Sequence, residues 1–267
     1  MIADYHIHTF LCKHAEGSPV EYVKEAIRKG IDEIGFADHC PYPKGHDPRF
    51  RMETSQFEEY RNIVFEMRAK FAKPSIRFGL EVDWVPGRMD EVFEKINLEP
   101  LDYIIGSVHY TDDFAVDNPE TISEWNKKDF ADKAWGRYME LVFEMVSSGL
   151  FNVIGHFDLP KKFGFYPTDM KTINRSITEI FRVAGEKRMV MEINSSGLRK
   201  PVREIYPSLE MLKMARSAGV RITFGSDAHA PSEVGADFDK AVELAKVAGY
   251  KEFCVFKKRK AVSVEIV

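Results

Sequence analysis

The sequence lacks the features of a membrane, secreted or disulfide-rich protein. Its three cysteines, Cys12, Cys40 and Cys254, are too few for a disulfide framework and form no CxxC pair for a thiolate zinc site. No run of about 20 apolar residues occurs, so we expect no membrane-spanning helix. The first ten residues have neither a basic segment nor a long apolar run, so we expect no signal peptide and a cytoplasmic location.

An excess of positive charge is also missing. The 267 residues carry a formal net charge of -4, which argues against a broad basic surface for nucleic acid. We interpret the basic run at residues 257–260 as a solvated turn. With 44% hydrophobic and 30% charged residues, the composition is typical of a globular protein.

Short apolar runs alternate with longer helical patterns along the chain. Because these runs are nearly continuous in apolar residues, they predict strands buried on both faces of a parallel sheet. The predicted strands are 2–6, 33–37, 76–82, 103–108, 152–156, 189–193 and 221–225. Helices are expected to begin at Pro19 and Thr54 and to span 88–96, 127–147, 170–187, 207–218 and 237–248. The alternation predicts one α/β domain over residues 1–267, with a sheet that closes into a barrel or stays open.

Most of the eight histidines, together with several acids, stand at the ends of the predicted strands. These residues are His6, His8, Asp38, His39, Glu81, His109, His156, Asp227 and His229. His14 lies in a loop instead, and His46 has no such position. Because the carboxyl ends of parallel strands converge in a barrel, the side chains point at a common space, and this favours closure.

Two short motifs strengthen this interpretation. In His6-x-His8, residues i and i+2 of a strand share one face, so both imidazoles can reach one ion. Asp227-x-His229 repeats the spacing on the opposite side of the barrel. A single histidine at a strand end is usually a hydrogen-bonded polar residue, but an ordered series is not explained in that way. Imidazole and carboxylate ligands suit zinc, iron or manganese, so we expect two or three divalent ions.

Anion-binding residues favour phosphoryl transfer over the deaminase and amidohydrolase chemistry that also uses an HxH motif. Divalent ions placed close together activate water and neutralise charge on a transferring phosphoryl group. Arg199, in the loop 194–201, offers a fork that matches a phosphate, although a surface arginine beside a turn is the alternative. Lys161 and Lys162 either add positive charge on the far side of the anion or are ordinary surface lysines.

Taken together, these motifs resemble the PHP (polymerase and histidinol phosphatase) superfamily. The resemblance runs from DYHIHTFLCKHAEG at 4–17 to FGSDAH at 224–229. Five stretches are similar to its histidinol-phosphate phosphatase branch: ADHCPYP at 37–43, GLEVDWVPG at 79–87, GSVHY at 106–110, GHFDLPKKFG at 155–164 and EINSSGLRKPVREIYPS at 192–208. The resemblance implies a distorted seven-stranded (β/α)7 barrel with a trinuclear metal centre, and hydrolysis of L-histidinol phosphate to L-histidinol and inorganic phosphate.

The resemblance also implies where each ion binds. The first site would hold His6, His8, Glu81 and Asp227; Glu81 would bridge to a second site with His109 and His156; the third would hold His14, His39 and His229. The residues expected to act in catalysis are Glu81, Asp227, His229 and Arg199, with Arg199 neutralising the phosphoryl oxygens during in-line attack by water. Lys161 and Lys162 stand where we expect arginine in the family, which leaves the second phosphate contact open.

A proline-rich loop at residues 40–52 follows the second predicted strand. We expect His46 in this loop, or Asp83 and Trp84, to contact the imidazole or amine of the substrate, and a rigid lid that excludes water is the alternative. Two other functions stay open: a phosphoesterase of the same superfamily acting on another monoester or on nucleic acid ends, and a metal-binding scaffold without catalysis. The acidic charge disfavours nucleic acid, and the complete ligand set disfavours the scaffold.

Overall fold

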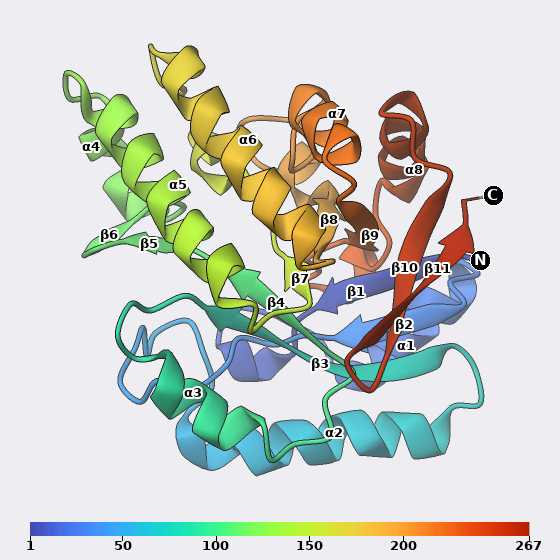
Figure 1. Cartoon of the computed structure of the whole chain (residues 1–267). Helices are drawn as coiled ribbons and strands as arrows, with labels where there is room; N and C mark the ends of the chain where they lie inside the picture. Colours follow the sequence, from blue (N-terminus) through green and yellow to red (C-terminus); the bar gives the residue numbers. More distant parts are fainter. Residues whose placement is uncertain (267) are drawn as a thin grey trace.

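A sheet of seven parallel strands forms the centre of the computed structural model, which describes residues 1–266 (Figure 1). The strand order is β1 (Ala3–Ile7), β2 (Glu33–Phe36), β3 (Ser75–Asp83), β4 (Tyr103–Ser107), β7 (Val153–Ile154), β8 (Val190–Asn194) and β9 (Arg221–Gly225). The first and last strands meet where His8 N donates to Ala228 O at 3.0 Å and Ala228 N donates to His6 O at 3.1 Å. The sheet is therefore a nearly closed barrel, which confirms the predicted (β/α)7 architecture.

Helices with one apolar face cover the outside of the barrel (Figure 1). They are α1 (Pro19–Arg28), α2 (Phe57–Lys70), α3 (Met89–Ile96), α4 (Ile122–Trp125), α5 (Phe130–Ser148), α6 (Met170–Glu186), α7 (Leu209–Ser217) and α8 (Phe238–Val247). The Ser18–Glu21 capping box that begins α1 is present, with Ser18 N donating to Glu21 at 2.6 Å. A helical segment begins at Thr54 as expected, with the 3-10 turn Thr54–Gln56 leading directly into α2.

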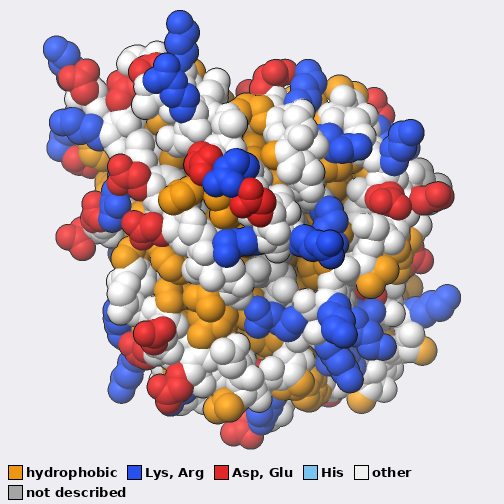
Figure 2. Space-filling model, viewed as in Figure 1, with side chains coloured by type: hydrophobic (Ala, Val, Ile, Leu, Met, Phe, Trp, Pro, Cys, Tyr) orange, Lys and Arg blue, Asp and Glu red, His pale blue; other side chains and the backbone are white. Residues whose placement is uncertain are grey.

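Two hairpins were not predicted from the sequence. A small one joins β5 (Tyr110–Thr111) to β6 (Phe114–Ala115), and a longer one at the C-terminus joins β10 (Glu252–Lys257) to β11 (Lys260–Glu265). The basic run at 257–260 forms the turn of the longer hairpin, where Lys258 and Arg259 have positive φ. Lysine and arginine side chains gather over this turn (Figure 2), and Lys257, Lys258 and Lys260 are exposed, as expected of a solvated turn.

Aromatic side chains close the end of the barrel at which the strands begin. Tyr103 lies against Gly35 and Gly79, where any β-carbon would collide with its ring, and its hydroxyl donates to Tyr5 O at 2.6 Å. Phe256 of the C-terminal hairpin packs on both tyrosines, with ring centroids 5.1 Å from Tyr5 and 5.5 Å from Tyr103. The opposite end, where the strands finish, carries the histidines. None of the helices in residues 1–266 has the length and apolar character needed to cross a bilayer.

Candidate metal centre

The strand ends bring all nine predicted metal ligands to one mouth of the barrel. His6 lies on β1 and Glu81 on β3, and the others lie in the segments that follow β1, β2, β4, β7 and β9. The rings are in contact distance across the barrel: the centroids of His8 and His229 are 4.1 Å apart, and those of His109 and His156 are 5.0 Å apart. His14 was not assigned to the site from strand position alone, and its ring centroid lies 4.5 Å from that of His229.

Glu81 occupies the centre of this cluster. Its Oε2 lies 2.8 Å from His39 Nδ1, 3.4 Å from His6 Nε2 and 3.6 Å from His8 Nε2. Its Oε1 lies 2.9 Å from His156 Nε2 and 3.6 Å from His109 Nε2. A carboxylate with separate sets of imidazoles at its two oxygens has the position required of a bridging ligand.

Asp227 faces the same imidazoles from the other side. Its Oδ1 lies 3.2 Å from His8 Nε2 and 3.8 Å from His6 Nε2. Its backbone has a φ of 51°, in the left-handed region that an aspartate rarely adopts, directly after β9 ends. Such strain persists where the surrounding structure imposes it, and functional sites are common places for it.

The polar atoms of the cluster fit divalent metal ions. Six of them are buried and have no hydrogen-bond partner: His6 Nε2, His8 Nε2, His39 Nδ1, Glu81 Oε2, His156 Nδ1 and His229 Nε2. Buried polar atoms are almost always paired, so six unpartnered atoms in one cluster fit a cation-binding site. Three groups have donor atoms within 4.8 Å of one another: His6, His8 and Glu81; Glu81, His109 and His156; and His14, His39 and His229. A fourth group contains His8, Cys12 and His229, and sequence reasoning did not anticipate Cys12 there.

The electrostatics divide the histidines into two sets. Burial lowers the pKa of His39 to about 4, and burial together with the charge of His8 lowers the pKa values of His14 and His229. These rings are therefore neutral near pH 7 and have a lone pair free for a metal. Burial by itself would lower the pKa values of His8 and His109. Neighbouring carboxylates have the larger effect and raise the pKa of His8 to about 9 and that of His109 to about 10. A metal ion at these rings would replace a proton.

The central carboxylates stay ionised. Burial alone would raise the pKa of Glu81 and of Asp227, but the surrounding histidines hold both pKa values well below the usual range. Two anionic carboxylates among imidazoles complete a donor set of the kind that binds zinc, iron or manganese.

Three buried carboxylates outside the cluster orient its histidines. Glu192 Oε1 lies 2.6 Å from His6 Nδ1, Asp83 Oδ1 lies 2.7 Å from His109 Nδ1, and Asp38 Oδ1 lies 3.4 Å from His8 Nδ1. Such partners fix the ring orientation and tautomer of metal-binding histidines. Sequence reasoning did not assign this role, although Glu192 inside an apolar strand and Asp83 two residues after Glu81 were signals for it.

The residues predicted to contact the substrate lie in different surroundings. Arg199 lies in the 3-10 turn Ser195–Arg199, where it donates to Ser226 O at 2.6 Å and lies 3.2 Å from Glu233 Oε1; its third nitrogen is buried without a partner. Lys161 is 1% exposed and does not line the cavity. Its ammonium forms an ion pair with Asp158 Oδ2 at 2.9 Å. Lys162 lines the cavity and lies 3.0 Å from Asp117 Oδ2.

The loop after β2 is tied to the cluster through Asp83. His46 Nε2 lies 2.6 Å from Asp83 Oδ2, and the same oxygen accepts from Arg51 at 2.9 Å. His46 does not line the cavity, and Trp84 turns away to donate to Glu144 at 3.1 Å. Substrate contacts by His46, Arg199 and Lys161 stay predictions.

A cavity of about 330 Å³ lies above the cluster. Its wall includes metal-binding candidates together with residues that sequence reasoning did not single out, namely Asp47, Phe50, Arg51, Tyr110, Asp117, Ser196 and Lys200. These residues come from the loop after β2, the β5–β6 hairpin and the turn after β8, so their convergence depends on loop conformation. The cavity therefore combines a cation-binding floor, an aromatic wall and charges of both signs.

This fold and this donor set define a β/α barrel with a candidate metal centre. The PHP domain model matches residues 4–196 of the chain. The chain therefore belongs to the PHP domain family.

Relatives with known names are similar over nearly the whole length. The "Probable histidinol-phosphatase" of Deinococcus radiodurans is 38% identical over 250 residues, which cover 93% of this chain and 94% of that protein. The "Histidinol-phosphatase" of Lactococcus lactis subsp. lactis is 30% identical over 260 residues, covering 95% of this chain and 93% of that protein. Among solved structures, histidinol phosphate phosphatase from Lactococcus lactis, complexed with zinc, L-histidinol and phosphate, has a TM-score of 0.83, 27% identity and 98% coverage of both chains.

Proposed function

We propose that this protein is a histidinol-phosphatase, which hydrolyses L-histidinol phosphate to L-histidinol and inorganic phosphate. The observation that carries the proposal is the agreement of the whole chain, at a TM-score of 0.83, with an enzyme that holds zinc, L-histidinol and phosphate. Six buried donor atoms without a hydrogen-bond partner at one end of the barrel support the hydrolytic activity. We further propose that residues 1–267 form one domain.

We propose three ion sites, with zinc, iron or manganese as occupants. Three of the four donor groups that meet within 4.8 Å correspond to the three proposed sites, and the mixture of imidazole and carboxylate supports the choice of metals. Ions of this kind lower the pKa of water and neutralise the charge of a phosphoryl group.

The side chains around the cavity would bind and orient the substrate. Lys162 and Lys200 supply positive charge for the phosphate on the wall of the cavity. Asp47 supplies negative charge for the ammonium of the amino alcohol, and Phe50 supplies apolar surface for its imidazole and keeps out bulk water. The ionised carboxylates of Glu81 and Asp227 would keep the imidazoles around them oriented during the reaction.

Arg199 acts from behind the cavity floor. Its guanidinium donates to the backbone oxygen of Ser226, the residue before Asp227. Arg199 therefore fixes the turn that carries Asp227 and His229. The family resemblance implies that Arg199 contacts the phosphate, and the unpartnered nitrogen of its guanidinium is the donor that remains for this contact.

The proposal is tested by measuring phosphate release with purified, metal-loaded protein. We expect kcat/KM for L-histidinol phosphate to exceed that for p-nitrophenyl phosphate by about a hundredfold or more, because binding of the remote amine and imidazole is used to orient the reacting group. Similar rates on many monoesters would leave a general phosphatase. Digestion of single-stranded DNA would favour a nucleic acid phosphoesterase, and bound metal with no turnover on any ester would indicate a non-catalytic scaffold.

A further inference from the structure

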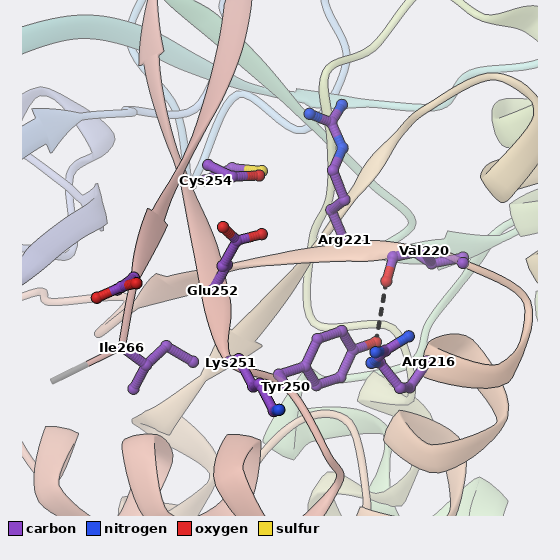
Figure 3. A pocket seen from close by; sticks show the side chains of 11 residues that line it. Arg216, Val220, Arg221, Tyr250, Lys251, Glu252, Cys254 and Ile266 are labelled. Carbon is purple, nitrogen blue, oxygen red and sulfur yellow. Dashed lines mark hydrogen bonds between the residues drawn. The ribbon is translucent and has the colours of Figure 1, made fainter.

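A second cavity, of about 620 Å³, lies at the other end of the barrel, where the C-terminal hairpin meets the beginning of β9 (Figure 3). Arg221 is the first residue of β9, and Asp227 follows the last residue of the same strand. The cavity is therefore separated from the metal centre by the length of a strand. Its lining is unrelated to the substrate cavity, because the two share no residue.

Two arginines line this cavity without an acidic partner among residues 1–266. The guanidinium of Arg221 donates to Arg188 O at 2.6 Å and also interacts with the thiol of Cys254. The guanidinium of Arg216, from α7, donates to Gly249 O at 3.3 Å and lies 5.7 Å from the ring centre of Tyr250. Each arginine has five N–H donors, so both retain donors for an anion.

Two glutamates that have no basic partner line the same cavity, which Lys251 also lines. Glu252 of β10 and Glu265 of β11 are directly opposite each other in the antiparallel ladder, so their side chains share one face of the hairpin. Like charges in that position are destabilising unless a cation lies between them. No lysine or arginine among residues 1–266 forms an ion pair with either carboxylate.

Apolar groups also line the cavity. The ring of Tyr250 is buried, and its hydroxyl donates to Val220 O at 3.1 Å (Figure 3). Val220 and Ile266 add aliphatic surface. A cavity lined by unpaired arginines, unpaired glutamates and an aromatic ring is complementary to a small dipolar molecule that has an apolar part.

We propose that this cavity binds a free α-amino acid as its zwitterion. The carboxylate of the ligand lies against Arg216 and Arg221, its ammonium lies between Glu252 and Glu265, and an apolar or aromatic side chain packs on Tyr250. A phosphate or nucleotide fits less well, because the two glutamates would repel it. The site is thus distinct from the proposed phosphatase site in both place and ligand charge.

Binding is tested by calorimetric titration of the full-length, metal-loaded protein with L-phenylalanine, L-leucine and L-histidine. We expect at least one of them to bind with a Kd of about 1 mM or tighter. For L-phenylalanine the matched probes are 3-phenylpropionate, which lacks the ammonium, and 2-phenylethylamine, which lacks the carboxylate. Each should bind about tenfold more weakly than the amino acid, because each loses one charge-assisted contact.

Two variants locate the binding. Arg221→Gln and Glu252→Gln should each weaken binding of the amino acid about tenfold, whereas Arg175→Gln and Glu66→Gln, at exposed helix positions outside the cavity, should leave it unchanged. Glu252 is exposed, so its variant reports on binding even if Arg221→Gln fails to fold.

Three results would overturn the proposal. They are the absence of binding by all three amino acids at about 10 mM, equal affinity for 3-phenylpropionate and L-phenylalanine, and binding that neither cavity variant changes.

Discussion

The two ends of the barrel use the same strands for opposite purposes. At the end where strands begin, a buried carboxylate is fully paired: Asp102 accepts from Lys258 N and from Phe78 N at 3.0 Å each, and it also pairs with Arg68. At the end where strands finish, buried nitrogens of His6, His8 and other histidines have no partner. In this barrel, stability and chemistry are therefore separated along the strand axis, as is usual for the fold.

The comparison predicts that changes at the two ends will have different consequences. Damage at the histidine end should remove activity and bound metal while the barrel stays folded, because the cluster contains few apolar contacts. Damage at the aromatic end should lower the free energy of unfolding and leave turnover nearly intact. Each prediction below tests one side of this separation.

The largest effect is expected for Glu81→Ala. The substitution removes the carboxylate that lies within 3.6 Å of five imidazoles, so kcat for L-histidinol phosphate should fall about a thousandfold or more. Bound metal, measured by inductively coupled plasma mass spectrometry, should fall with it. Circular dichroism should remain that of the parent protein. A variant with full metal content and more than about a tenth of the parent kcat would show that Glu81 is not a ligand.

The next effect is expected at the aromatic end, for Tyr103→Ala. Tyr103 is fully buried, and removing its ring should lower the free energy of unfolding by about 3–5 kcal/mol. The matched variant Tyr103→Phe loses only the hydrogen bond to Tyr5 O and should cost about 1 kcal/mol. Denaturant titration measures both, and kcat of the folded fraction should stay within about threefold of the parent value. A loss of kcat as large as that of Glu81→Ala would disprove the separation.

The separation also explains which parts of the structure the sequence could predict. Seven strands and the helices between them follow from apolar periodicity, and the strand ends follow from the polar residues that terminate each apolar run. The fold of the histidine end was therefore predictable from local patterns. The aromatic end was not, because Phe256 reaches Tyr5 only after the C-terminal hairpin has folded back over some 250 residues of chain.

The candidate site was predictable to a different degree in its inner and outer parts. The nine predicted ligands follow from strand position and family motif, and their side chains gather at one mouth of the barrel. The wall of the cavity was not predicted, since Asp47 and Asp117 lie in loops and Tyr110 lies in a two-residue strand, none of which has a periodic pattern. Lys161 and Lys162 are adjacent in sequence, yet one ammonium is buried on Asp158 and the other faces the cavity. No pattern of residue types distinguishes such neighbours. The 3-10 turn that contains both lysines determines which side chain is buried and which faces the cavity.

A smaller effect is expected when the orienting carboxylates are changed. Asp83→Asn and Glu192→Gln keep the size of the side chain but remove the charge that orients His109 and His6. Each should lower metal affinity or kcat about 10- to 100-fold. Competition with a chelator measures metal affinity, and kcat and KM are measured separately at saturating metal. Recovery of kcat at high metal concentration would show that the carboxylates act by positioning ligands. Unchanged affinity and kcat would show that packing alone holds the rings.

The smallest effects are expected for the two adjacent lysines of one turn. One lysine should affect substrate binding and the other should affect stability. Lys162→Gln removes a charge from the cavity wall and should raise KM for L-histidinol phosphate about three- to tenfold with little change in kcat. Lys161→Gln removes the buried partner of Asp158, so it should lower the melting temperature and leave KM unchanged. Steady-state kinetics and thermal unfolding distinguish the two outcomes. If Lys161→Gln raised KM instead, its side chain would have to reach the substrate, and phosphate binding would extend behind the wall of the cavity.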